Sequence, residues 1–141
     1  MTNFRTLATL LLALVSALAC SQTEASADAL APPTPAMPSH WRVISDINFA
    51  AADIRPVAAN LGAKVSALRN TTYDAGGRTV KLNTIVAASS GDADSIMRAL
   101  GKMKTEQWFL RRGLLIYEFV GSNDAIPELH KGRDLLIAHS R

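Results

Sequence analysis

The sequence has a single cysteine, Cys20, and no cysteine follows it along the chain. A domain formed by the residues after Cys20 therefore has no intrachain disulfide, no reactive thiol, no iron–sulfur cluster and no cysteine-ligated zinc. Its stability has to come from the burial of apolar surface instead.

Other signatures of chemistry are also missing. The three histidines, His40, His130 and His139, lie in no HxxxH spacing and beside no Ser/Asp arrangement typical of a catalytic triad. No glycine-rich loop matches a phosphate cradle, and the strand expected over residues 81–87 has no aromatic on which to stack a base. The net charge of +3 is scattered along the chain. We expect no catalytic residue, no metal, no cofactor and no nucleic-acid partner.

The N-terminus has the layout of an export signal. An uncharged apolar run, LATLLLALVSALA, occupies residues 7–19 and follows Arg5. A membrane span needs about 20 apolar residues, so this run is short for a span and suited to the core of a signal peptide. We therefore predict a signal peptide over residues 1–19.

Two cleavage sites compete. Residues 16–20, Ser-Ala-Leu-Ala-Cys, resemble a bacterial lipobox. That resemblance implies cleavage before Cys20, lipidation of Cys20 and, because Ser21 follows it, sorting to the outer membrane. The alternative is cleavage after Ala27, at a small-x-small site, which would remove Cys20 and release a soluble protein.

Residues 20–40 are rich in proline, with Pro32, Pro33, Pro35 and Pro38 among small polar residues. Proline disfavours both helices and sheet ladders, so we predict an extended tether here and one domain over residues 41–141.

The spacing of apolar residues predicts the elements of that domain. We expect strands over 41–47 and 114–120, helices from 53 to 61, from 90 to 104 and from 124 onward, a hairpin over 63–89 with its turn at 74–77, and either a helix or a strand over 105–112. This order resembles that of ferredoxin-like folds. It implies an α+β, βαββαβ two-layer sandwich, with both main helices on one face of a four-stranded antiparallel sheet and an added C-terminal helix.

The hairpin provides a candidate binding face. With Arg69 opposite Leu82 and Thr71 opposite Val80, one face of the hairpin is mainly apolar and is expected to pack on the core. The other face mixes amides, a cation and two apolar residues, and an open sheet face of this kind suits a protein partner or a second copy of the chain. Its members are Leu68, Asn70, Thr72, Lys81, Asn83 and Ile85. The alternative is that the C-terminal helix or a second copy covers this face.

These features together favour an exported envelope protein with a non-catalytic binding or assembly domain. One alternative is a small periplasmic hydrolase or isomerase. It would use Glu118 or Tyr117, with Arg111 and Arg112 as an anion clamp. A third possibility is an anion-binding surface for lipid headgroups or acidic glycans, which would make association depend on salt.

Overall fold

The computed structural model describes residues 32–103 and 108–139 of the chain. The signal peptide predicted over residues 1–19, the lipidation site at Cys20 and the alternative cleavage site at Ala27 all lie outside the described residues.

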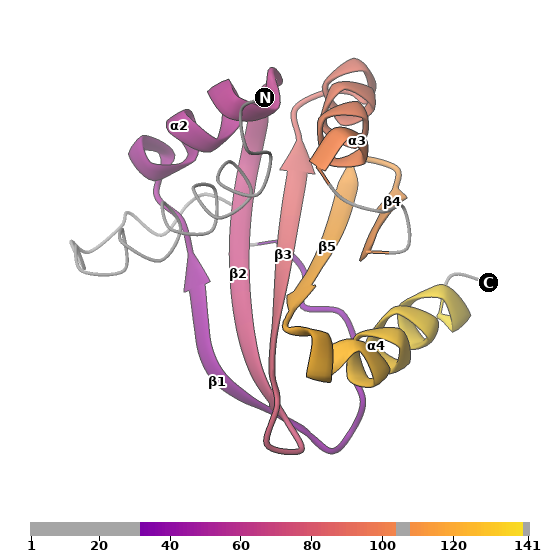
Figure 1. Ribbon diagram of the computed structural model, residues 1–141. Helices are drawn as coiled ribbons and strands as arrows, with labels where there is room; N and C mark the ends of the chain where they lie inside the picture. The colour runs from indigo at the N-terminus through magenta and orange to yellow at the C-terminus, as the bar shows by residue number, and fades with distance from the viewer. Residues whose placement is uncertain (1–31, 104–107, 140–141) are drawn as a thin grey trace, which may run out of the picture.

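The described chain forms one antiparallel sheet with helices packed on it (Figure 1). The elements are β1 (Trp41–Asn48), α2 (Ala51–Leu61), β2 (Val65–Ala75), β3 (Thr79–Ala87), α3 (Ser90–Met103), β4 (Phe109–Arg112), β5 (Leu115–Gly121), the 3-10 turn η3 (Asn123–Ala125) and α4 (Ile126–Ala138). The five strands lie in the order β1-β2-β3-β5-β4, and every neighbouring pair is antiparallel. The α+β class is therefore confirmed.

The order of strands and helices differs from the ferredoxin-like arrangement that the sequence predicted. α2 connects β1 to β2, which are adjacent and antiparallel, so these elements form no crossover between parallel strands. The sheet also has a fifth strand. Residues Phe109–Arg112 form β4 and turn back into β5 through Gly113, whose φ of 59° suits glycine. The strand alternative for this segment was therefore the correct one.

The hairpin forms as predicted, with a small difference in register. Gly76 and Gly77 have φ values of 66° and 83°, and the Asp74 carboxylate accepts the Gly77 N–H at 2.7 Å. Thr71 pairs with Leu82, two residues from the expected partner Val80, because β2 continues to Ala75 before the chain turns. A shift of two residues keeps the side chains of residues 67–75 on the faces that the alternation assigned to them. At the start of β2, a bulge between Val65 and Ala67 changes the register, and Val65 packs against the same core as Leu68.

α2 begins earlier than the sequence suggested. Its first residue is Ala51, so Asp53 lies within the first turn and makes no cap, and Pro56 lies inside the helix. The predicted end is confirmed. Gly62 adopts the left-handed conformation with φ 62°, and its N–H caps the carbonyls of Ala58 and Ala59.

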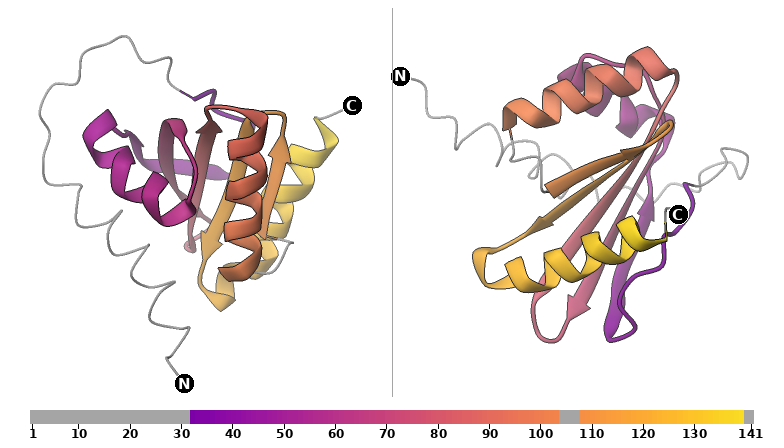
Figure 2. Two further views of the ribbon diagram at one scale, coloured as in Figure 1. Left: turned by 90° about the horizontal axis from the view of Figure 1, so that it is seen from above. Right: turned by 90° about the vertical axis from the view of Figure 1, so that its right-hand side faces the viewer.

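Both faces of the sheet are covered by helices, so the expected two layers are in fact three. Successive residues of a strand point to opposite faces. On β3, Ile85 belongs to a core beneath α2 and α3, whereas Leu82 belongs to a second core beneath α4. Ile116 and Phe119 of β5 divide in the same way. Figure 2 shows α3 and α4 on either side of the strands.

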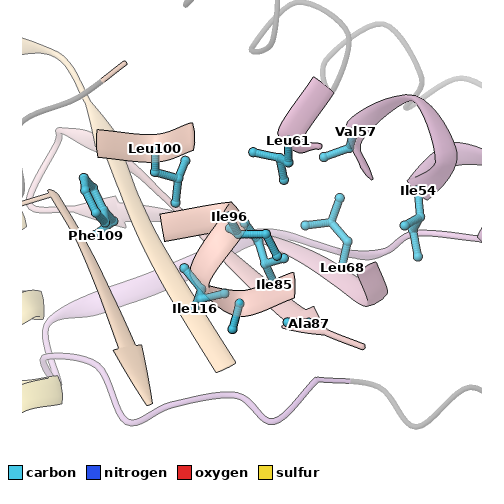
Figure 3. Close-up of a cluster of buried hydrophobic side chains, with 11 residues drawn as sticks. Ile54, Val57, Leu61, Leu68, Ile85, Ala87, Ile96, Leu100, Phe109 and Ile116 are labelled. Atoms are coloured by element: carbon cyan, nitrogen blue, oxygen red, sulfur yellow. The ribbon is translucent and has the colours of Figure 1, made fainter. Parts of the chain in front are cut away.

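The first core confirms that both main helices pack on the same face. Ile54 and Leu61 of α2 and Ile96 and Leu100 of α3 are all buried in it (Figure 3). The sheet contributes Leu68, Ile85, Ala87, Phe109 and Ile116. Full burial of one such large side chain contributes about 1.5–3 kcal/mol.

The second core joins the two ends of the domain. Trp41, at the start of β1, packs with Leu129 and Leu136 of α4. A Cβ added at Gly132 would lie 2.5 Å from the Trp41 ring, so glycine is what permits the close approach of helix and indole. Met37, from the segment predicted to be tether, also packs against this core. The end of that segment is therefore part of the domain.

Candidate functional site

The predicted binding face lies on a single face of the sheet, but its apolar members are covered. Leu68 and Ile85 are only 4% and 3% exposed, because α2 and α3 pack over them. Their assignment to an open apolar surface was therefore wrong. The face is apolar close to the helices and polar away from them. The residues of the polar part are Asn70, Thr72, Lys81 and Asn83.

A row of hydrogen-bonded side chains crosses this polar part. Asn70 donates from Nδ2 to Asn83 Oδ1 at 2.6 Å, and Asn83 donates from Nδ2 to Glu118 Oε2 at 2.8 Å. The register places the three residues side by side on β2, β3 and β5. Asn70 and Glu118 are buried, so Glu118 is a bonded acid within the sheet and not a flat surface carboxylate. The row ties three strands together.

The proposed anion clamp does not assemble as a pair. Arg111 and Arg112 are consecutive on β4, so their side chains leave opposite faces of the sheet. Arg111 is already held by the Asp94 carboxylate, by Ser90 Oγ at 3.0 Å and by the carbonyl of Gly113 at 2.7 Å. A joint clamp is therefore contradicted.

The two candidate catalytic residues are separated for the same reason. Tyr117 and Glu118 are neighbours on β5 and point to opposite faces, Tyr117 into the α4 core and Glu118 into the amide row. Burial raises the pKa of Tyr117 above its usual value of 10, which keeps the phenol neutral at physiological pH. The structure does not bring the four residues of the enzyme hypothesis to one site.

Glu128 is a buried acid that the sequence analysis missed. Its Oε2 accepts the Trp41 indole N–H at 2.8 Å and a bond from His40 Nε2 at 2.7 Å, and its Oε1 accepts from Lys131 Nζ at 2.6 Å. Lys131, then Trp41, contribute most to lowering the pKa of Glu128 from 4.5 to about 2. The Glu128–Lys131 spacing of three on a helix was the only available signal, because His40 and Trp41 are distant in sequence.

A second ionic contact fastens the edge strand β1. Arg69 donates from Nε to Asp46 Oδ1 at 2.7 Å, and this bond is the main cause that lowers the pKa of Asp46. Thr71 Oγ1 donates to the same carboxylate at 3.1 Å. Arg69 also donates from Nη1 to the carbonyl of Pro32 at 2.9 Å, which brings the proline-rich segment against β2. These contacts have a structural role.

β1 is the exposed edge of the sheet. Among residues 32–103 and 108–139 its one strand partner is β2, and a bulge interrupts that pairing between Val43 and Ser45. Val43 is 58% exposed and Ile44 is 61% exposed. A shallow cavity of about 490 Å³ lies beside these residues. Exposed apolar side chains on an edge strand are typical of a surface where another chain can pack.

A second cavity lies between α2 and the beginning of β2. Its volume is about 480 Å³. Its walls are mainly apolar and small: Ala51, Ile54, Ala58, Ala59, Gly62, Ala63 and Val65, with Arg55, Lys64 and Ser66 at the rim. The groove was not predicted from the sequence, because it depends on where β1 ends relative to β2.

The histidines do not converge on a metal site. His40 contacts Glu128, the His130 ring packs 5.1 Å from the Trp108 ring, and His139 Nδ1 bonds the carbonyl of Leu135. Among residues 32–103 and 108–139, no group of three or more histidine, cysteine or acidic side chains is placed to hold a metal ion.

Comparison with known proteins adds no relative. No protein-family model matches the sequence, and neither the curated proteins nor the solved structures contain a match. Within the described part of the chain, no helix has the length and apolar character needed to cross a bilayer.

Proposed function

We propose that the protein is an exported, lipid-anchored binding or assembly module of the bacterial cell envelope, and that it binds other proteins without catalysis. The lipobox-like residues 16–20 and the proline-rich segment after them support the anchor and the tether. The domain would then be held close to the membrane by the lipid alone.

The exposed edge strand β1 is the surface that supports the proposed binding of a partner protein. In the part of the chain that the structure describes, the outer edge of β1 has no strand partner, and Val43 and Ile44 on this strand are both more than half exposed. The buried acids Glu118 and Glu128, in contrast, are each bonded to neighbouring side chains that hold the fold. An edge strand with exposed apolar residues suits strand addition or side-by-side assembly with another protein.

The anchor is tested by the intact mass of the protein from membrane and soluble fractions of a bacterial host. We expect a membrane-bound species that begins at Cys20 and carries the mass increment of a diacylglyceryl or triacyl group. A Cys20→Ala variant should lose that increment and the membrane association. A soluble wild-type species that begins at Asp28 would rule out the anchor.

The binding edge is tested by photo-crosslinking in intact cells. A photoreactive residue replaces Ile44. In the control it replaces Arg98, which is exposed on α3 and donates to Ser95 of its own helix. We expect a discrete crosslinked product from position 44 and none from position 98. Equal patterns from the two positions would mean that β1 is not the binding edge.

A further inference from the structure

β2 extends beyond the end of its neighbour β1. The pairing of the two strands ends where Asn48 faces Arg69, and the last backbone contact is the Phe49 N–H donated to the Leu68 carbonyl at 2.9 Å. In the preceding segment of β2, residues 65–67, Val65 and Ala67 pair with Ala87 and Val86 of β3, and a bulge at Ser66 interrupts this pairing. Within the described residues, the outer edge of this segment has no strand partner.

The groove between α2 and β2 lies along this free segment. Val65 and Ser66 belong both to the segment and to the groove, and Ile54 and Ala58 of α2 form the facing wall. The groove is therefore next to the free edge of β2, where a further strand could add. In Figure 1, the ribbon of β2 extends past the end of β1 toward α2. A strand added here would gain backbone hydrogen bonds from β2 and would place alternate side chains against alanines.

Two cations border the groove. Arg55 and Lys64 are exposed, and no carboxylate of residues 32–103 or 108–139 lies within 4.0 Å of either side chain. The nearby Asp92 carboxylate accepts the backbone N–H of Lys64 and the Ser89 hydroxyl, and it offsets one of these two positive charges without cancelling the other. The charge at the rim is therefore positive and favours a partner with acidic residues.

We propose that residues 65–67 of β2 and the facing side of α2 form a docking site for an extended acidic peptide segment of a partner protein. The segment adds as a strand beside β2, its apolar side chains enter the groove, and its acidic residues pair with Arg55 and Lys64. This site deepens the proposed binding function and rests on it. The free edge is only about three residues long, so we expect affinity in the micromolar range.

The test uses the full mature chain and three synthetic ten-residue probes in a fluorescence polarisation assay. The first probe has a core of alternating valine and threonine flanked by glutamates. The second has the same core flanked by lysines. The third keeps the glutamates but has proline at two alternate core positions, which removes backbone donors. We expect the first probe to bind at least about ten-fold more tightly than the others, and the preference over lysine flanks to shrink in 0.5 M salt.

Protein variants locate the site. The double variant Arg55→Glu with Lys64→Glu should reverse the preference between the glutamate and lysine probes, because both residues are exposed and their replacement leaves the core intact. Ala58→Phe should fill the groove and remove binding of all probes. The control Arg78→Glu lies at the hairpin turn, at the other end of β2, and should bind like wild type.

Four outcomes would overturn the site: no binding of any probe, equal affinity for glutamate and lysine flanks, unimpaired binding of the proline probe, or unchanged preference in the double variant. Each of these would leave the lipid increment on Cys20 and the crosslinks from position 44 in place. Failure of the docking site is therefore distinguishable from failure of the proposed envelope function.

Discussion

Two residues of α4 determine how the two ends of the domain pack together. Glu128 holds His40 and Trp41 through one carboxylate, and Gly132, four residues later on the same helix, makes room for the Trp41 ring. Both residues look unremarkable in the sequence, where Glu128 is a first-turn acid and Gly132 a weak helix former. Their roles come from the indole that packs against them.

The Glu128 contacts predict a pH dependence of stability. A carboxyl whose pKa falls from 4.5 to about 2 on folding stabilises the protein above pH 4.5, and this contribution is lost as the pH falls toward 2. Its partner Lys131 is half exposed, so solvent screening reduces the effect to about 1–2 kcal/mol. The free energy of unfolding is measured in urea at pH 7 and at pH 2.5. At pH 7, Glu128→Gln should have a lower free energy of unfolding than wild type. Between pH 7 and pH 2.5, this free energy should fall less in the variant than in wild type.

Asp134→Asn is the matched control for this prediction. Asp134 lies on the same helix, is 71% exposed and has only a loose contact of 3.9 Å with Arg133. Its pH profile should follow that of wild type. If Glu128→Gln also follows the wild-type profile, the Glu128 contacts contribute no pH-dependent stability.

Gly132 gives a second prediction, in which two effects oppose each other. Alanine is a better helix former than glycine by about 1 kcal/mol. At position 132, however, the added Cβ would meet the buried Trp41 ring at 2.5 Å and the Phe119 ring at 3.1 Å. Overpacking of this kind costs about 1–3 kcal/mol, which equals or exceeds the gain in helix propensity. Gly132→Ala should therefore lower the free energy of unfolding or leave it unchanged.

Gly101→Ala on α3 separates propensity from packing. The Cβ added there would lie 3.8 Å from Phe109, an ordinary contact. The free energy of unfolding of this variant, measured by chemical denaturation, should therefore be higher than that of wild type by up to about 1 kcal/mol. An equal gain in Gly132→Ala would show that Trp41 and α4 are not packed closely.

The strands of the hairpin have a different character at each end. Toward α2 and α3, the face that holds Leu68 and Ile85 is a dry core, and toward the turn the same face holds the amide row and Lys81. The sequence predicted that this whole face is open and that Leu68 and Ile85 are its apolar members. Leu68 and Ile85 are buried because α2 and α3 pack over them.

Substitutions along β3 test this division. Ile85→Ala should lower the free energy of unfolding by about 2–5 kcal/mol, because Ile85 is 3% exposed in the core. Lys81→Ala, four residues away on the same face, should change it by less than about 0.5 kcal/mol. Both changes are measured by guanidinium denaturation. If Ile85→Ala and Lys81→Ala lower the free energy of unfolding by similar amounts, the helices do not cover one end of this face.

The whole molecule is a sheet with two separate cores, one on each face. Leu100 belongs to the core under α2 and α3, and Leu136 belongs to the core under α4. Every strand from β2 to β5 pairs with its neighbours, and β2, β3 and β5 contribute side chains to both cores. The two cores should therefore unfold together, because neither can be lost without exposing the shared strands.

Cooperativity is tested by alanine variants on either side. Leu100→Ala and Leu136→Ala should each cost about 2–5 kcal/mol. In each variant, the unfolding curves from far-UV circular dichroism and from tryptophan fluorescence should coincide, since Trp41 reports on the α4 core. Separate transitions for the two signals in Leu136→Ala would show that α4 and its core form an independent unit.

The local features of this protein follow from short stretches of its sequence. Gly76 and Gly77 determine the hairpin turn, Gly62 ends α2, and the spacing of Ile54, Leu61, Ile96 and Leu100 assigns the inner faces of both helices. These features depend on backbone conformation and on side-chain period over a few residues, which the sequence displays directly.

The strand order, the covered face, the Glu128 contacts and the groove beside β2 were decided only by the tertiary structure. Each depends on segments that are far apart in the chain: His40 and Glu128 meet across 88 residues, and the groove exists because β1 stops opposite Arg69 while β2 continues. The strand order, with β5 between β3 and β4, arises from competition among all possible strand partners, and no local pattern records the outcome of that competition.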